Sequence, residues 1–381
     1  MTSLDRRSFL ASTGLAAASS LWLPHLQPRK QRILVLGGTG FLGPAIVNAG
    51  LARGHEFTLF NRGKTNPGLF AKAGGVEQIQ GQRRRPRKDR PNAPAQDLKS
   101  LENRKWDAVV DTSAYFTGEV EDVCKVLAGN VGQYVFISSI SVYKTAETDD
   151  TPLDEQSPLC ACADKYIEDL GKEFENYGAL KRYCEEAASA AFPGKTTLVR
   201  PGYIVGPGDP TDRFTYWPAR FVRGGECLAP GDPDNDLQFI DVRDLGEWIV
   251  HSIEQGVTGA FNAVGFDGRI STGEFLHTGK GTLNHTCSFT WVDDAFLLAN
   301  KVSSWSEMGC WTPTKMNGHT SNARSIAAGA KYRPIAETIR DTAAWVQDKN
   351  GRGDRKWGAG MTPERERELL AKWKAERQAK K

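Results

Sequence analysis

A glycine-rich turn constrains this chain more than any other feature. The turn is Gly37-Gly-Thr-Gly40-Phe-Leu-Gly43; it follows the apolar run 33–36 and precedes a helical stretch over 44–53. Glycines at a strand-to-helix junction permit a tight turn, close main-chain approach to a pyrophosphate and close packing of the helix on the sheet. The unpaired N–H groups of the helix start then bind the phosphates. This context predicts a dinucleotide-binding turn.

Strand-like runs alternate with helical stretches, which predicts an α/β fold with a Rossmann-type doubly wound parallel sheet. The runs are 32–36, 56–60, 76–80, 107–111, 133–138 and 196–199. We expect the nucleotide-binding domain to span 31–212 and to be rejoined by about 236–265. A smaller C-terminal substrate domain is expected from 213–235 and 266–330, followed by a helical segment over 331–381.

A tyrosine and a lysine four residues apart form a second motif, Tyr177-Gly-Ala-Leu-Lys181. Apolar residues recur around them at spacings of three and four, so one helix would place both side chains on its inward face, one turn apart. The expected stripe is Tyr166, Leu170, Phe174, Tyr177, Lys181, Cys184 and Ala188. A lysine that snorkels beside a core tyrosine is the alternative.

Hydroxyl groups follow a buried strand at 134–138, where Ser138 and Ser139 precede Val142-Tyr143. These serines alone are also compatible with a strand-end turn in which they satisfy main-chain groups. Two further segments complete the set, Val199-Arg-Pro-Gly-Tyr-Ile-Val-Gly-Pro207 and Phe239-Ile-Asp-Val-Arg-Asp244.

Taken in order, the five motifs resemble the extended (atypical) short-chain dehydrogenase/reductases, in the NAD-dependent epimerase/dehydratase branch. The resemblance implies that Ser139, Tyr177 and Lys181 are catalytic, that Lys181 also binds the nicotinamide ribose, and that the 199–207 segment borders the nicotinamide. The expected cofactor-binding residues are Gly37, Thr39, Gly40, Phe41, Leu42, Gly43, Asn61, Arg62, Asp111, Thr112, Tyr177, Lys181 and Pro201.

Hydride transfer from a carbinol carbon needs a base for the hydroxyl proton, and a free tyrosine is only ~0.1% ionised at pH 7. We expect the Lys181 ammonium and an oxidised nicotinamide to favour the Tyr177 phenolate. Ser139 would hydrogen-bond the substrate oxygen and hold it near that phenol.

Cofactor choice is expected at the end of the second strand, where Asn61-Arg62 stands in place of the acidic residue that binds NAD ribose. Arg62 can pair with a 2′-phosphate, so NADP is favoured and NAD is possible. The alternative is a solvated Arg62, with Asn61 alone binding ribose. Gly81-Gln82 replaces the Gly-Asp pair that commonly contacts adenine in the family. The basic run 83–90 is interpreted as a solvated loop, with phosphate binding as the alternative.

Substrate specificity is expected in the segment 209–221, where Arg213 would bind a carboxylate or phosphate and Tyr216 and Trp217 would stack on a sugar face. The alternative is a lid packed by its own aromatic residues.

The first 30 residues resemble a twin-arginine export signal, with Arg6-Arg7-Ser8-Phe9-Leu10 before the weakly apolar stretch 15–23. That stretch is too short to span a bilayer, so we expect export to the periplasm or another extracytoplasmic space, without stable membrane insertion. A net charge of +3 shows no overall bias toward nucleic acid. Of seven cysteines, Cys160 and Cys162 lack further ligands, and no metal site is predicted.

Three functions remain open. The first is a redox-neutral epimerase, dehydratase or lyase that acts on a small carbohydrate with a retained nicotinamide. A homodimer is compatible with this function. The second is a dehydrogenase or reductase with exchangeable NADP. The third is RNA binding, because chloroplast stem-loop-binding proteins also resemble this branch; the combination of Ser139, Tyr177 and Lys181 argues against it.

Overall fold

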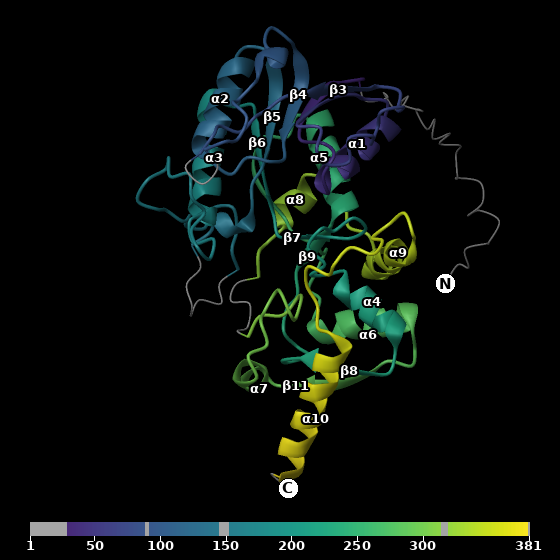
Figure 1. Cartoon of the computed structure of the whole chain (residues 1–381). Helices are drawn as coiled ribbons and strands as arrows, with labels where there is room; N and C mark the ends of the chain where they lie inside the picture. The colour runs from purple at the N-terminus through teal and green to yellow at the C-terminus, as the bar shows by residue number, and fades with distance from the viewer. Residues whose placement is uncertain (1–28, 88–90, 145–151, 314–318, 380–381) are drawn as a thin grey trace, which may run out of the picture.

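A seven-stranded, wholly parallel sheet forms one half of the computed structural model, which describes residues 29–87, 91–144, 152–313 and 319–379 (Figure 1). The strand order β10-β6-β5-β4-β1-β2-β3 reverses direction between β1 and β4, which is where doubly wound sheets bind their ligands. The predicted fold class is therefore confirmed. The strands are β1 (Arg32–Leu36), β2 (Glu56–Asn61), β3 (Val76–Gln80), β4 (Trp106–Asp111), β5 (Val131–Ile137), β6 (Thr196–Pro201) and β10 (Gly259–Ala263).

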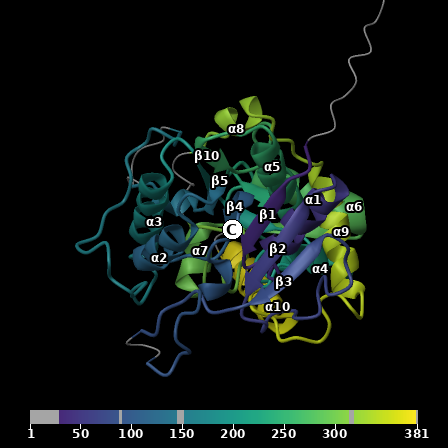
Figure 2. The same ribbon diagram turned by 90° about the horizontal axis from the view of Figure 1, so that it is seen from above.

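Helices cover both faces of this sheet (Figure 2). Helices α1 (Leu42–Ala52) and α5 (Val242–Glu254) pack together on one face, while α2 (Thr117–Leu127) and α3 (Tyr177–Ala191) pack on the other. Ile33 and Val35 of β1 enter the first core, and the alternate residues of the same strand enter the second. Burial on both faces explains why the strands are continuous apolar runs.

The other half of the molecule is a smaller layer of helices and short strands, below the sheet in Figure 1. Strand β7 (Tyr203–Val205) pairs with β9 (Phe239–Asp241), and β8 (Glu226–Pro230) pairs with β11 (Ser288–Val292). The helices are α4 (Tyr216–Arg223), α6 (Thr272–Leu283), α7 (Asp294–Ala299), α8 (Ala323–Ala327), α9 (Ile335–Gln347) and α10 (Pro363–Ala379). The short α8 contacts β10 of the large sheet. No helix in the described part of the chain is both long and apolar enough to cross a membrane.

The terminal helix α10 is attached by a buried carboxylate. Glu366 accepts hydrogen bonds from Arg220 Nε at 2.8 Å, from Arg223 Nη2 at 2.6 Å and from the main-chain N–H of Leu228 at 3.1 Å. Paired with two guanidinium groups and a main-chain donor, the charge is compensated although it is buried. Leu369, Leu370 and Trp373 of α10 pack in the hydrophobic core of the smaller half.

The inward stripe expected around Tyr177 and Lys181 is wrong at its N-terminal end. The helix that carries the tyrosine and lysine begins at Tyr177, because the chain turns at Gly171 and Phe174, both with positive φ. Tyr166 and Phe174 are accordingly 50% and 64% exposed and do not belong to the inward stripe. Residues 1–28, which carry the predicted export signal, lie outside the described residues.

Candidate active site

The glycine-rich turn joins β1 to α1 with the close contacts that its sequence predicts. Gly37 and Gly38 have φ of +120° and +91°, a region that favours glycine. A Cβ on Gly43 would lie 2.4 Å from the Cα of Gly38, so a side chain there would push the helix off the turn. Gly40 has open space where a Cβ would be, and it lines a cavity. The turn therefore offers main-chain groups to a ligand.

That cavity is formed by four segments: the turn, the end of β2, the chain after β3 and the chain after β4. It is lined by Leu36, Gly37, Thr39, Gly40, Phe60, Asn61, Arg62, Lys64, Thr65, Gly81, Gln82, Arg83, Arg84 and Ser113. Asn61 Oδ1 accepts from the Gly63 N–H, but its buried Nδ2 has no hydrogen-bond partner among the described residues. A buried donor without a partner costs free energy unless an acceptor arrives. The donor, the open turn and the basic wall fit the ribose and phosphates of a dinucleotide.

Several other predicted cofactor residues lie behind the lining of this cavity and do not face it. Leu42 is buried in the α1 core, and Phe41 is half-buried with its ring against Gly208. Thr112 Oγ1 donates to Leu36 O at 2.9 Å, and a Cβ on Gly37 would lie 2.4 Å from Thr112 Oγ1. Pro201 is buried at the end of β6.

Asp111, predicted to contact the cofactor, is instead committed to the protein. Its carboxylate forms a bidentate ion pair with Arg83, accepts from the Tyr134 hydroxyl at 2.7 Å and is fully buried. The prediction that 83–90 is a solvated loop fails at the same place, because Arg83 is only 6% exposed. A cofactor contact from the Asp111 side chain is excluded by this pairing.

Ser139 and Tyr177 come together where β5 and α3 meet. Ser139 precedes the short 3₁₀ turn 140–142 and lies beside the Tyr177 phenol, close enough to lower its pKa. Its Oγ accepts a hydrogen bond from Ser141 N at 3.1 Å. Gly178 makes the approach possible, because a Cβ there would lie 2.0 Å from Ser141 O. A serine hydroxyl and a phenol are therefore brought together by α3 and the turn after β5.

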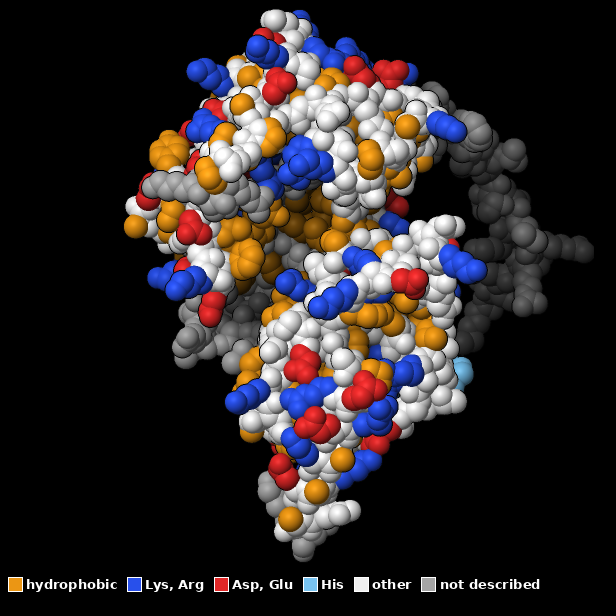
Figure 3. Space-filling model, in the orientation of Figure 1, with side chains coloured by type: hydrophobic (Ala, Val, Ile, Leu, Met, Phe, Trp, Pro, Cys, Tyr) orange, Lys and Arg blue, Asp and Glu red, His pale blue; other side chains and the backbone are white. Residues whose placement is uncertain are grey.

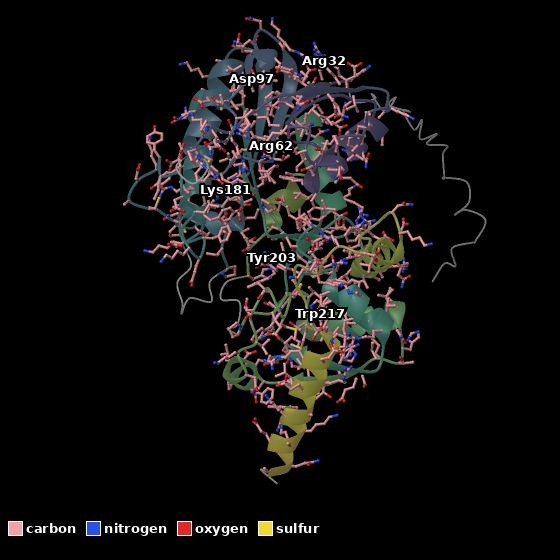
Figure 4. The ribbon with its side chains drawn as sticks, viewed as in Figure 1. Arg32, Arg62, Asp97, Lys181, Tyr203 and Trp217 are labelled. Atoms are coloured by element: carbon pink, nitrogen blue, oxygen red, sulfur yellow. The ribbon has the colours of Figure 1, made fainter. Side chains whose placement is uncertain are left out.

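Lys181 lies one helical turn after Tyr177 and is 4% exposed. Its Nζ donates to the carbonyl oxygens of Ala114 (2.9 Å) and Ile137 (2.8 Å) and lies 5.1 Å from the centre of the Tyr115 ring. A snorkelling lysine would reach water, whereas this ammonium is held at the carboxyl end of the sheet. Figure 4 shows Lys181 and Arg62 on the side of the sheet that faces the smaller half.

The electrostatics of this pair differ from the expectation. Burial raises the pKa of Tyr177 to about 12, against the smaller opposing effect of the nearby Ser139 hydroxyl. Burial also lowers the pKa of Lys181. The phenol is therefore protonated at neutral pH, and Lys181, whose ammonium is bound by two carbonyls, is not among the groups that lower the pKa of Tyr177.

The aromatic residues predicted to stack on substrate belong to the core of the smaller half. Trp217 is 1% exposed, donates from Nε1 to Gly309 O at 2.8 Å and packs on Phe221 and Phe275. Tyr216 is 6% exposed. Both substrate-binding assignments are wrong, because a side chain without accessible surface cannot contact a sugar. Arg213 is exposed and its charge acts on Tyr203, so it remains a candidate.

Sequence reasoning missed an aromatic pair at the junction of the halves. Tyr203 of β7 stacks on Trp305, with ring centres 3.9 Å apart and planes inclined by 16°, and both line a cavity with Trp311 and Gln238. Figure 3 shows a hollow with apolar walls between the halves and basic side chains on its upper rim. The signal was available in Arg200-Pro-Gly-Tyr203, which places a tyrosine just past the sheet.

Metal chemistry has no visible site in the described ranges, where no group of three or more His, Cys, Asp or Glu is arranged to hold an ion. Cys160 and Cys162 are free thiols.

Comparison with protein families gives one match over the sheet and its site. Residues 33–264 match the model of the NAD dependent epimerase/dehydratase family. The matched segment contains the glycine-rich turn, Ser139, Tyr177 and Lys181.

Curated relatives are similar over more than half of the chain. The epimerase family protein SDR39U1 of Bos taurus is 27% identical over 259 residues, covering 64% of this chain and 78% of that protein. A 2-alkyl-3-oxoalkanoate reductase of Stenotrophomonas maltophilia is 30% identical over 226 residues, covering 57% and 64% respectively.

Solved structures share the fold. WbmG of Bordetella bronchiseptica, solved in complex with NAD and UDP, is 18% identical with a TM-score of 0.60, covering 87% of this chain and 100% of that one. A UDP-N-acetylglucosamine 4-epimerase of Methanobrevibacter ruminantium is 16% identical with a TM-score of 0.60, covering 83% and 98%.

Proposed function

The chain belongs to the NAD-dependent epimerase/dehydratase family, and we propose that it epimerises or dehydrates a small carbohydrate with no net change of redox state. It is an enzyme of the short-chain dehydrogenase/reductase superfamily. The observation that carries the proposal is the position of the Tyr177 phenol beside Ser139, one helical turn from the buried ammonium of Lys181. The family match favours an enzyme over the RNA-binding alternative.

The chain's own residues would hold the nicotinamide dinucleotide along the carboxyl edge of the sheet. The main chain of 37–43 would bind the pyrophosphate, Asn61 Nδ2 the adenosine ribose, and Lys181 the nicotinamide ribose. When bound, the dinucleotide supplies a hydride acceptor and donor for one substrate carbon.

Tyr177 moves the proton that accompanies this transfer. Burial raises the pKa of its phenol to about 12, so the phenol holds its proton at neutral pH, as the acid half of the cycle requires. The positive charge of an oxidised nicotinamide and of Lys181 would stabilise the phenolate for the base half. Ser139 keeps the reacting oxygen of the substrate beside the phenol.

A redox-neutral reaction also suits the proposed export. A twin-arginine signal exports folded chains, so the nucleotide would be loaded in the cytoplasm and retained. Free NADP is expected to be scarce outside, where an enzyme that needs fresh cofactor in each cycle would stop after one turnover. Free sugars, uronates or glycosides are then favoured as substrates over nucleotide sugars.

The test is to remove unbound nucleotide by gel filtration and to count turnovers on a sugar panel without added cofactor. Many turnovers per site support the proposal. A single stoichiometric reduction that resumes only when NADP is added would contradict it and would support the reductase alternative, the activity in the name of the Stenotrophomonas maltophilia relative.

A further inference from the structure

Two arginines from separate segments line one cavity without a carboxylate partner. Arg62 follows β2, and Arg84 lies in the segment 81–87 after β3; both line the dinucleotide cavity and the adjoining outer cavity. Among the described residues, neither guanidinium forms an ion pair or a hydrogen bond with another side chain. Lys64 lines both cavities as well. The wall therefore carries positive charge that no carboxylate in the described part of the chain pairs.

The residues on both sides of Arg84 are held by contacts with the rest of the protein. The preceding Arg83 is buried in its ion pair with Asp111, and the following Arg85 pairs with Asp122 of α2. The main chains of Gln82 and Asp97 exchange hydrogen bonds of 3.2 and 2.7 Å. Arg83 and Arg85 are thus paired with carboxylates of the protein. Arg84, between them, lines the cavity, with its guanidinium 5.7 Å from the centre of the Tyr115 ring.

The electrostatics of Arg84 are those of a group without its counter-ion. Partial burial lowers its pKa, the nearby charge of Arg62 lowers it further, and Glu119 opposes both. Glu119 is itself buried with both carboxylate oxygens unpartnered, and burial raises its pKa. Two guanidinium groups held close together in this way gain from an anion that contacts both.

We propose that Arg84 and Arg62 together bind the 2′-phosphate of NADP, which makes the segment 81–87 after β3 an element of cofactor specificity. The assignment rests on the proposed function, because it places a nicotinamide dinucleotide in this cavity. Asn61, beside Arg62, carries the unpartnered donor that would meet the same ribose. Binding the dianion relieves the repulsion between the two guanidinium groups, so the selectivity depends on both.

The experiment compares adenosine 2′,5′-bisphosphate with 5′-AMP by calorimetric titration, which requires no substrate or turnover. The variants are Arg84→Ala and Arg62→Ala. Arg85→Ala is the matched control, because it removes the same charge from the same segment while its partner is Asp122 and it does not line the dinucleotide cavity. Circular dichroism and thermal unfolding verify the fold of each variant.

The wild type should bind the bisphosphate at least about tenfold more tightly than 5′-AMP. Arg84→Ala and Arg62→Ala should each weaken bisphosphate binding by about tenfold or more and change 5′-AMP binding by less than about threefold. Arg85→Ala should change neither by more than about threefold. Bisphosphate affinity should also fall more steeply with salt.

Equal losses for both nucleotides in Arg84→Ala, or an equal effect of Arg85→Ala, would overturn the assignment. So would a wild type that binds both nucleotides equally, although that result leaves a nicotinamide enzyme with NAD intact. A folded wild type that binds neither nucleotide would overturn the proposed function as well, so the two failures are distinguishable.

Discussion

Arg83 and Asp111 form a bidentate ion pair in which Nη1 donates to Oδ1 and Nη2 donates to Oδ2, with side chains 7% and 0% exposed. The pair joins the segment after β3 to the end of β4, where the sheet meets its cavity. Burial alone would raise the pKa of Asp111, but the Arg83 guanidinium and the Tyr134 hydroxyl hold that pKa below its ordinary value. The carboxylate is therefore charged at neutral pH and fixes the wall beside Arg84.

Asp111→Asn should lower the free energy of unfolding by about 3–5 kcal/mol, because it leaves the Arg83 charge buried without its partner. Urea denaturation at neutral pH measures the loss. The double variant Asp111→Leu/Arg83→Met, which removes both charges, should cost less than the sum of the single variants. An Asp111→Asn loss under about 1 kcal/mol, typical of an exposed pair, would contradict the buried pair.

The same pair predicts a pH dependence of stability. Because the folded pKa of Asp111 is lowered, its contribution is present above the unfolded pKa of about 3.9 and is lost as pH falls through the folded value. Denaturation midpoints measured down the acid range should therefore fall more steeply for the wild type than for the double variant. Parallel curves would contradict it.

Tyr177→Phe should keep the fold and the cofactor yet lower kcat by about 100-fold or more, since it removes only the ionisable hydroxyl. Lys181→Met should harm both cofactor affinity and rate. Steady-state kinetics with a nucleotide titration separate the two. A Tyr177→Phe enzyme that retains more than about a tenth of kcat, a loss under ~1.4 kcal/mol, would remove Tyr177 from proton transfer.

The Tyr177 phenol should titrate near its raised pKa of about 12 in the cofactor-free protein, and at lower pH when an oxidised nicotinamide is bound. Ultraviolet difference spectra of the wild type minus Tyr177→Phe isolate its ionisation from that of the other tyrosines. The rate of substrate oxidation should rise with pH over the range in which the bound form ionises. An unchanged titration on cofactor binding would count against the proposed charge stabilisation.

Trp217→Ala should act on stability, with a loss of about 3–5 kcal/mol for an emptied aromatic site in the core. Arg213→Ala should instead leave stability within about 0.5 kcal/mol and raise KM, because its side chain is exposed near the cleft. Thermal unfolding and kinetics on the same pair of variants provide the contrast. A stable Trp217→Ala enzyme with raised KM would restore Trp217 to the substrate site.

Local sequence signals were sufficient for the sheet and for the glycine-rich turn. The turn could be predicted because glycine tolerance and phosphate binding depend on adjacent residues, and the strands because both of their faces are apolar. The inward direction of Lys181 followed from four-residue spacing to Tyr177. Each of these inferences uses contacts that are close along the chain.

The errors involve partners that are far apart in the sequence. Arg83 is indistinguishable from a solvated arginine until Asp111, 28 residues later, is placed beside it. Trp217 has the composition of a sugar platform, and its burial depends on a main-chain acceptor 92 residues away. The prediction that the helix begins before Tyr177 failed for a different reason. The apolar spacing typical of a helix is present at 166–174, although the chain turns there.

Retention of a nicotinamide dinucleotide in the cavity at the glycine-rich turn can be measured from the nucleotide that co-purifies with the folded protein. Gel-filtered protein is denatured, and the released small molecules are examined by absorbance and mass. We expect close to one dinucleotide per chain, with the mass of NADP or NADPH. NAD in the same amount would contradict the 2′-phosphate assignment alone. Protein that carries no nucleotide and recovers none when incubated with NADP or NAD would contradict the proposed function itself.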